Sequence, residues 1–353
     1  MEDFAKNNKE TLTCKLKLKA LPTRSLFNRV CLNLDIESLK FNLELWIAEV
    51  FQTLGLHSQV VSIDGKSLAG TVDKSKCHSK DHGFAHVVSM FDQHLNVTVS
   101  CIESEDKVSE VFTFRKLLTQ AQIVPKIVTA DALHCNQDTF RFLKKNNLDY
   151  IIGVKANCSL LLSELKKLTR NDIPNNDSIK KTYEYQDSSI KRTVTAYQIP
   201  PDFKVVKKYK PRAYSVWNQK TRQYTKQLRV PVYKSWGHLN YSSFIKIERT
   251  NYRKHTKQVN YYLSSLPPNA EKLGKLIQKH WFVENNLHRE KDVVFKEDKH
   301  LTKYYRSAKV FSRIITTVIN IYRLNNYQSM KKATQRFCNR VAECLTLLGY
   351  DLR

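Results

Sequence analysis

The sequence predicts a mixed α/β protein, in which helices cover a sheet and a β-rich insertion interrupts the chain. Three observations lead to this prediction. Between residues 58 and 170, short β-branched runs alternate with segments of helical spacing. Between 171 and 266, Tyr-rich segments alternate with period two and place Lys and Arg on the alternate positions. From residue 267 the helical spacing returns.

The segment 58–170 contains the strands and helices of the predicted sheet. Strands are expected in QVVSIDGKSL, FAHVVSMFD, NVTVSCIES, KIVTAD and DYIIGV, and helices in SEVFTFRKLLTQAQI, CNQDTFRFLKKNN and CSLLLSELKKLTR. The turn-forming residues 94–96 between the second and third strands indicate a hairpin. The first strand is expected to end at Asp64, with Gly65 in a turn, and the fourth at Asp131.

Four parts of the chain follow from these patterns. Residues 1–57 form a partial helical region with Asp35 as an N-cap, and residues 58–170 form the first part of the core. Residues 171–266 form a basic, antiparallel β insertion that precedes the helix carrying Glu284. Residues 267–353 complete the core with that helix, capped by Asn269, a second helix in SAKVFSRIITTVINIYRL and a C-terminal helix in MKKATQRFCNRVAECLTLLG.

The charge of the chain points to a polyanionic partner. Lys and Arg number 59 against 33 Asp and Glu, which gives a formal net charge of +26. A genome-wide preference for Lys codons is the alternative explanation. No run of 18 apolar residues and no signal peptide occurs, so we expect an intracellular protein without a membrane span. The eight cysteines are scattered without CxxC spacing, which favours reduced thiols over zinc ligands or disulfides.

Three carboxylates are the candidates for chemistry. Asp64 and Asp131 are each expected at a strand end of one sheet, where two carboxylates can share a hard cation such as Mg²⁺. The alternative is that each Asp only caps the following turn. Glu284 has His280, Trp281, Leu287 and His288 one helical turn away, which predicts a place on the inward-facing stripe. A salt-bridged helix Glu is the alternative for this residue.

Several blocks of the sequence resemble, in the same order, those of the H-repeat-associated group of bacterial insertion-sequence transposases. The blocks are VVSIDGKSLAGT, IVTADALHCNQ, DYIIGVKAN, NYYLSSL and HWFVENNLHREKDVVFKED, and the resemblance covers roughly residues 22–325. It implies an RNase H-like sheet flanked by helices, with a β-rich insertion and a DDE triad. The triad positions are Asp64, Asp131 and Glu284, which would hold Mg²⁺ or Mn²⁺ to cut and join double-stranded DNA.

The same blocks suggest residues that bind DNA or support the triad: Lys66, Lys155, Asn157, His280, Trp281, Asn285, His288, Lys291 and Asp292. For Lys66, a phosphate contact and a salt bridge remain alternatives. We expect Lys155 and Asn157 to contact DNA rather than to organise the site. Trp281 is expected in the core, with stacking on a base as the alternative. Both histidines are expected to be structural, and the alternatives are phosphate binding, orientation of Glu284 or acid–base chemistry. The chain departs from the family pattern at Cys158, Gln278 and Arg289.

The function expected from these observations is metal-dependent phosphodiester cleavage and strand transfer by an insertion-sequence transposase. Such a protein would act in the bacterial cytoplasm at the nucleoid, and as a homodimer on DNA because two ends must be joined. The N-terminal segment before LPTRSLFNRV is shorter than is usual in the family. This favours the alternative of an inactive transposase relic that only binds DNA. A related RNase H-like nuclease that cuts without joining is a second alternative.

Overall fold

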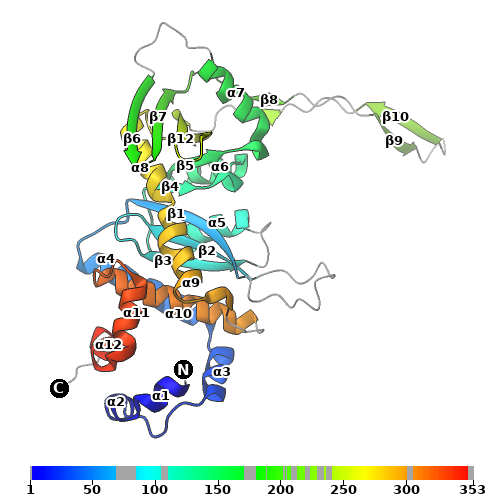
Figure 1. Ribbon diagram of the computed structural model, residues 1–353. Helices are drawn as coiled ribbons and strands as arrows, with labels where there is room; N and C mark the ends of the chain where they lie inside the picture. The colour runs from blue at the N-terminus through cyan, green and yellow to red at the C-terminus, as the bar shows by residue number, and fades with distance from the viewer. Residues whose placement is uncertain are drawn as a thin grey trace. The chain divides into compact units, whose positions relative to one another are not determined.

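The computed structural model of the chain describes residues 2–68, 85–104, 110–170, 180–187, 189–201, 203, 205–207, 213–218, 223–228, 234–235, 241–299 and 305–348 (Figure 1). The chain forms two units. Unit 1 consists of Met1–Ala130 and Leu276–Arg353, and unit 2 of Asp131–Lys275. The predicted domain limits at 57, 170 and 266 stay a prediction, because a compact unit and a functional domain need not coincide.

A mixed sheet with the strand order β3-β2-β1-β4 forms the centre of unit 1. Its strands are β1 (Val60–Leu68), β2 (Ala85–Asp92), β3 (Thr98–Ser104) and β4 (Ile127–Ala130). β1 is antiparallel to β2 and parallel to β4, and β2 and β3 are antiparallel. Asn96 takes a positive φ of 58° in the turn between β2 and β3, which confirms the predicted hairpin.

Helices pack on both faces of this sheet. α5 (Glu110–Gln120) packs against β2 and β3 on the face that carries His86. α10 (Tyr305–Leu324) lies on the opposite face, where Ala308 packs against Leu68 and Val87. α3 (Arg24–Asn33) and α4 (Ile36–Thr53) also contact α10. α1 (Glu2–Asn7) and α2 (Lys9–Lys15) complete the N-terminal helices.

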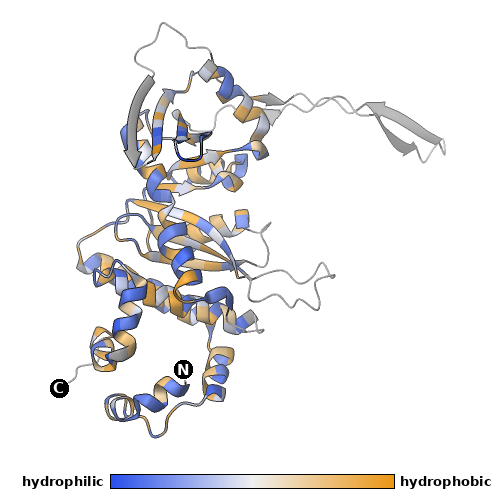
Figure 2. Cartoon of the chain, in the orientation of Figure 1, coloured by the Kyte–Doolittle hydropathy of each residue, from blue (hydrophilic) through white to orange (hydrophobic). Residues whose placement is uncertain are grey.

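The N-cap predicted at Asp35 is confirmed, because its carboxylate accepts hydrogen bonds from the backbone N–H groups of Glu37 and Ser38. In Figure 2 the helices show hydrophilic and hydrophobic residues together, which is the pattern of helices that cover a core on one side only.

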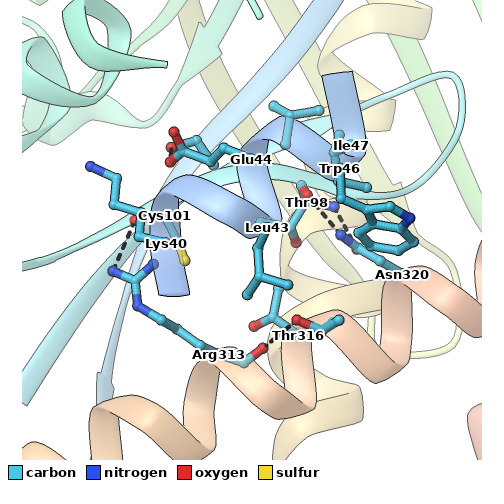
Figure 3. A pocket seen from close by; sticks show the side chains of 13 residues that line it. Lys40, Leu43, Glu44, Trp46, Ile47, Thr98, Cys101, Arg313, Thr316 and Asn320 are labelled. Carbon is cyan, nitrogen blue, oxygen red and sulfur yellow. Dashed lines mark hydrogen bonds between the residues drawn. The ribbon is translucent and has the colours of Figure 1, made fainter. Parts of the chain in front are cut away.

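Two polar side chains of α10 bind the backbone of β3. Asn320 donates to the carbonyl of Thr98 and accepts from its N–H, both at 2.8 Å. Arg313 donates to the carbonyl of Cys101 at 3.4 Å and forms an ion pair with Glu103 at 2.7 Å. Figure 3 shows Thr98, Cys101, Arg313 and Asn320 around a cavity of about 30 Å³ between α4, β3 and α10. A cavity of this size holds water but no organic ligand.

Unit 2 contains an antiparallel sheet with the order β5-β13-β12-β7-β6. The strands are β5 (Asp149–Val154), β6 (Lys180–Asp187), β7 (Ile190–Gln198), β12 (Ser243–Asn251) and β13 (Thr256–Ser264). Two short pairs accompany it, β8 (Val206–Lys207) with β11 (Lys234–Ser235) and β9 (Ala213–Asn218) with β10 (Gln223–Leu228). The antiparallel pairing predicted for the insertion is confirmed for these strands.

The helices of unit 2 agree with the sequence pattern. α6 (Gln137–Lys145) and α7 (Ser159–Arg170) lie where helices were predicted, and short 3₁₀ turns precede them, η3 (Ala132–His134) and η4 (Ala156–Cys158). Phe140 of α6 packs with Tyr150 of β5, with ring centroids 5.0 Å apart. The sheet of this unit is therefore anchored to its helices through an aromatic core contact.

The helices after residue 267 differ from the prediction in two places. α8 (Ala270–His280) begins as expected, with Asn269 Oδ1 accepting from the N–H of Lys272 at 2.9 Å. A π-helix, η5 (Val283–His288), then interrupts it before α9 (Arg289–Val293) and η6 (Glu297–Lys299). The predicted C-terminal helix is divided into α11 (Met330–Asn339) and α12 (Val341–Leu347) at Arg340, whose ψ of 67° cannot continue a helix.

The described residues bear on two expectations, the one about membrane spans and the one about the cysteines. None of the helices among them is long and apolar enough to cross a membrane. Seven of the cysteines lie in the described part of the chain and all seven are free thiols. Cys158 donates to the carbonyl of Cys135 at 2.8 Å, and its hydrogen bond with the Cys135 thiol lowers the pKa of Cys158.

Candidate active site

Asp64 lies inside β1, not at its end as the sequence predicted. The parallel pairing of β1 with β4 stops at the pair Ile63 and Ala130, whereas the antiparallel pairing with β2 continues to Leu68. The strand therefore does not turn at Gly65. Ile63 and Ala130 are the last paired residues of these two parallel strands. Asp64 directly follows Ile63, and Asp131 directly follows Ala130.

Gly65 is required by a buried pair that lies against its backbone. The ring of His86 contacts Glu110 Oε2 at 2.8 Å through Nε2, and Ser67 Oγ at 3.1 Å through Nδ1. A Cβ atom on Gly65 would lie 2.4 Å from His86 Nε2 and 2.7 Å from the Glu110 carboxylate. The glycine of the Asp-Gly-Lys block thus provides space for a side-chain pair and not a turn.

Asp131 begins unit 2 and caps η3. Its Oδ1 accepts from the N–H of Leu133 at 2.8 Å, so the capping role considered from the sequence is present and uses one carboxylate oxygen. Asn157 donates to the carbonyl of Ala132, next to this aspartate. Gly153 leaves room for the same loop, because a Cβ there would be 3.2 Å from Ala132 N. Asn157 therefore organises the loop, and Lys155 is exposed.

Glu284 is exposed, contrary to the inward-facing stripe that its helical neighbours predicted. The π-helix changes the faces, so that Val283, Leu287 and His288 are buried instead. The side chain of Glu284 makes no hydrogen bond or ion pair with the described residues. Trp281 is 49% exposed and meets His280 edge-on, so the expectation of a core tryptophan is wrong.

Two histidines of this helical segment approach β1 and β4 within unit 1. His288 Nδ1 lies 3.4 Å from Asp64 Oδ2, and His280 Nδ1 lies 3.0 Å from Thr129 Oγ1. Burial raises the pKa of Asp64, but the contact with His288 and the charges of both histidines outweigh burial and hold that pKa below its usual value. Asp64 is therefore ionised at neutral pH.

A polar network lies two residues before Asp64 along β1, on the same face of the sheet. The amide of Gln93 donates to Ser62 Oγ at 2.9 Å, to Thr129 Oγ1 at 3.1 Å and to the carbonyl of Leu276 at 3.4 Å. Ser62 and Thr129 are paired in register and are buried. Because these buried hydrogen bonds connect the two strands with the backbone of α8, they hold the strand segment from which Asp64 projects against that helix.

Lys66 belongs to a buried ionic cluster. Its Nζ lies 2.8 Å from Asp292, 2.9 Å from Glu297 and 3.4 Å from Asp298. Lys291 lies 3.4 Å from Glu297 and donates to Ser312 at 2.8 Å. Of the two alternatives for Lys66, the salt bridge is present.

The cluster also explains the titration of its central carboxylate. Burial raises the pKa of Glu297, but the two lysines outweigh burial and bring that pKa to about 2. Lys66, Lys291 and Asp292 thus fasten η6 and α9 to β1, and Asn285 is exposed on the helical segment.

The carboxylates of Asp64, Asp131 and Glu284 are of the type that binds divalent cations. The described residues contain no group of three His, Cys, Asp or Glu side chains close enough to hold one. Asp64 and Glu284 belong to unit 1 and Asp131 to unit 2. Hard cations take carboxylate oxygens, and Asp64 is ionised while Glu284 has no competing cationic partner among the described residues.

Four residues that position the site were not identified from the sequence: Gln93, His86, Glu110 and Glu297. A signal existed for the first, since the strands VVSID and IVTAD each carry a hydroxyl residue two positions before the aspartate, on the same side of the strand. A buried hydroxyl in an apolar strand needs a hydrogen-bond partner. No local pattern indicates Glu110 or Glu297, because their partners lie far away in the sequence.

Comparison with known proteins identifies the family. The model of the family Transposase DDE domain matches residues 55–321. Putative protein YbfL of Escherichia coli K12 is 30% identical over 289 residues, covering 80% of this chain and 68% of that protein. The H repeat-associated putative transposase YhhI of the same strain is 29% identical over 289 residues, with coverage of 80% and 68%.

More distant similarities were also found. Putative transposase YncI of Escherichia coli O157:H7 is 23% identical over 325 residues, covering 91% of this chain and 75% of that protein. Among solved structures, the piggyBac transposase synaptic complex with hairpin DNA is matched with a TM-score of 0.42 and 12% identity, over 96% of this chain and 70% of that one. The family match and the blocks noted in the sequence agree, and the chain belongs to the family of transposases with a DDE domain.

Proposed function

We propose that this transposase cuts DNA at the ends of an insertion sequence and joins them to a target, using divalent metal ions at Asp64, Asp131 and Glu284. The observation that supports the proposal most is the registered pair Ile63 and Ala130, because the two residues that follow it are both aspartates. The π-helix that carries Glu284 contacts β1, the strand of Asp64, within the same unit.

The residues of the chain have separate roles in this proposal. Asp64 and Asp131 provide oxygen ligands from neighbouring strands, and Glu284 provides a third from an exposed position. His288 keeps Asp64 ionised, and the ionic cluster of Lys66 holds the helical segment against the sheet. When bound, Mg²⁺ or Mn²⁺ supplies activation of the attacking water or 3′-hydroxyl and stabilisation of the leaving oxygen.

The test is cleavage and strand transfer on duplex DNA that carries the element's own ends, with Mg²⁺ or Mn²⁺. Asp64→Asn and Glu284→Gln should each abolish cleavage and leave DNA binding intact, as measured by gel shift. Glu271→Gln is the matched control, because Glu271 is an exposed glutamate whose only described ion pair is with Lys275. Full activity of Glu284→Gln would remove Glu284 from the site.

Two rival functions predict different outcomes in the same assay. An inactive relic binds the ends, but the unmodified chain cuts nothing with either metal. A nuclease without joining activity cuts the ends, but it does not transfer a precut 3′-hydroxyl end to a target. We further propose a homodimer on DNA, acting at the bacterial chromosome in the cytoplasm. Sedimentation with end DNA that yields only a complex with one protein chain would contradict the dimer.

A further inference from the structure

Three hydrogen-bond donors lie side by side across the sheet of unit 2. Arg249 of β12 is the register partner of Arg192 on β7 and of Gln258 on β13. Residues directly opposite each other on antiparallel strands project from the same face. The three side chains therefore form one row, in which both arginines are half-buried and Gln258 is exposed.

The neighbouring row on this face is apolar. Val194 and Ile247 are register partners one step further along the strands and are buried. α8 covers this part of the face, since a Cβ atom on Gly274 would lie 3.0 Å from Val194. The arginine row thus begins where the helix-covered core of unit 2 ends. The apolar pair Val194 and Ile247 lies on one side of it, and the half-buried pair Ile190 and Asn251 lies on the other.

Nothing in the described part of the chain neutralises Arg249. Two like charges directly opposite each other on neighbouring strands destabilise a sheet. Arg249 forms no ion pair with the described residues, and its buried Nε has no hydrogen-bond partner among them. Glu248, the adjacent carboxylate in sequence, projects from the other face and is paired with Lys246 at 3.4 Å and Lys257 at 3.2 Å.

We propose that Arg192 and Arg249 together bind one phosphate of the DNA backbone, with Gln258 as a further donor. This inference rests on the proposed function, because it takes duplex DNA as the partner. Guanidinium groups bind phosphate oxygens with paired hydrogen bonds, and an anion between the arginines compensates the charge of Arg249. The contact positions DNA without reading its sequence.

The edge of the sheet allows DNA to approach this row. β13 pairs with β5 only from Tyr261 to Ser264, and its residues Thr256–Asn260 are all exposed. In the described structure these residues pair with β12 alone. Since Gln258 is one of them, the arginine row ends at an open strand segment whose exposed side chains are polar except for Val259: Thr256, Lys257, Gln258 and Asn260.

The salt dependence of DNA affinity tests the proposal. Each lost phosphate contact should reduce the slope of log K against log salt by about 0.9 on duplex DNA, which is about 3.5-fold less change in affinity between about 50 and 200 mM salt. Arg249→Ala, Arg192→Ala and the double variant should all show this one reduction, because the arginines share one phosphate. Arg141→Ala, which removes an exposed arginine paired with Asp138, is the control and should keep the slope.

Stability provides an independent readout. Arg249→Ala should not lower the unfolding midpoint in low salt, because it removes a half-buried charge that no described residue neutralises, whereas the loss of a structural arginine would lower the midpoint. Four results would each overturn the shared-phosphate site. The slope could stay unchanged in Arg249→Ala, or the double variant could show twice the reduction in slope of a single variant. Arg141→Ala could reduce the slope as much as Arg249→Ala does, or Arg249→Ala could lower the unfolding midpoint. Failure of the unmodified chain to bind duplex DNA would instead overturn the proposed function.

Discussion

Replacement of Gly65 by alanine tests the buried pair beside the candidate site. The new Cβ atom would lie 2.4 Å from His86 Nε2 and 2.7 Å from Glu110, so either the strand or the pair must move. Forcing a methyl group into a packed site costs about 1–3 kcal/mol. Separating His86 from Glu110, both almost fully buried, leaves polar atoms unsatisfied at about 1–3 kcal/mol. We expect Gly65→Ala to lower the free energy of unfolding by roughly 2–6 kcal/mol.

Urea unfolding followed by circular dichroism measures this loss. Gly55→Ala is the control, because Gly55 has a φ of 63° but no atom within 4 Å of an added Cβ. It should cost only the backbone strain, about 1–2 kcal/mol. In a His86→Ala background the closest contact is absent, so Gly65→Ala should cost less there. An equal cost of Gly65→Ala with and without the His86 ring would refute the steric argument.

Three further predictions follow from the pKa values and exposures. The pKa of Glu297 is about 2 instead of 4.5, so its ion pairs stabilise the fold above pH 4.5 and lose about 3 kcal/mol as the pH falls towards 2. Glu297→Gln should remove this part of the pH dependence of unfolding, and an unchanged acid limb would contradict the assignment. Cys158, with its lowered pKa, should react with iodoacetamide before the buried Cys101, whose pKa burial raises, as mass spectrometry can determine. Trp281→Ala should change the free energy of unfolding by less than about 0.5 kcal/mol, whereas Phe114→Ala should lower it by about 3–5 kcal/mol. A similar loss in both variants would show that Trp281 is a core residue.

Local patterns in the sequence were sufficient to predict most helices and strands. The β-branched runs around Asp64 and Asp131 predicted β1 and β4, and the cap at Asn269 predicted the start of α8. The Asp-Gly pair was misleading. A turn and a strand that passes close to another side chain both favour glycine, and only the distant His86 and Glu110 decide between them.

The orientation of Glu284 and Trp281 was not predictable from helical spacing. Spacing arguments assume 3.6 residues per turn, and the π-helix adds a residue between α8 and α9 that changes which side chains face inward. The ionic cluster was equally hidden, because Lys66 and Glu297 are 231 positions apart. The family resemblance named Lys66, Lys291 and Asp292 among the residues that bind DNA or support the triad. Only the structure shows that Lys66 contacts Asp292 and that both lysines contact Glu297.

The hydrogen bonds from α10 to β3 have a consequence for how this transposase behaves among its own copies. An unprotected edge strand can recruit the strand of another molecule, which is a common route to aggregation. The side-chain amide of Asn320 occupies both hydrogen-bonding groups of Thr98, as a neighbouring peptide would. Arg313, two helical turns earlier, holds the next part of the strand. The helix therefore acts as a substitute strand, and self-assembly through this edge would first require α10 to detach.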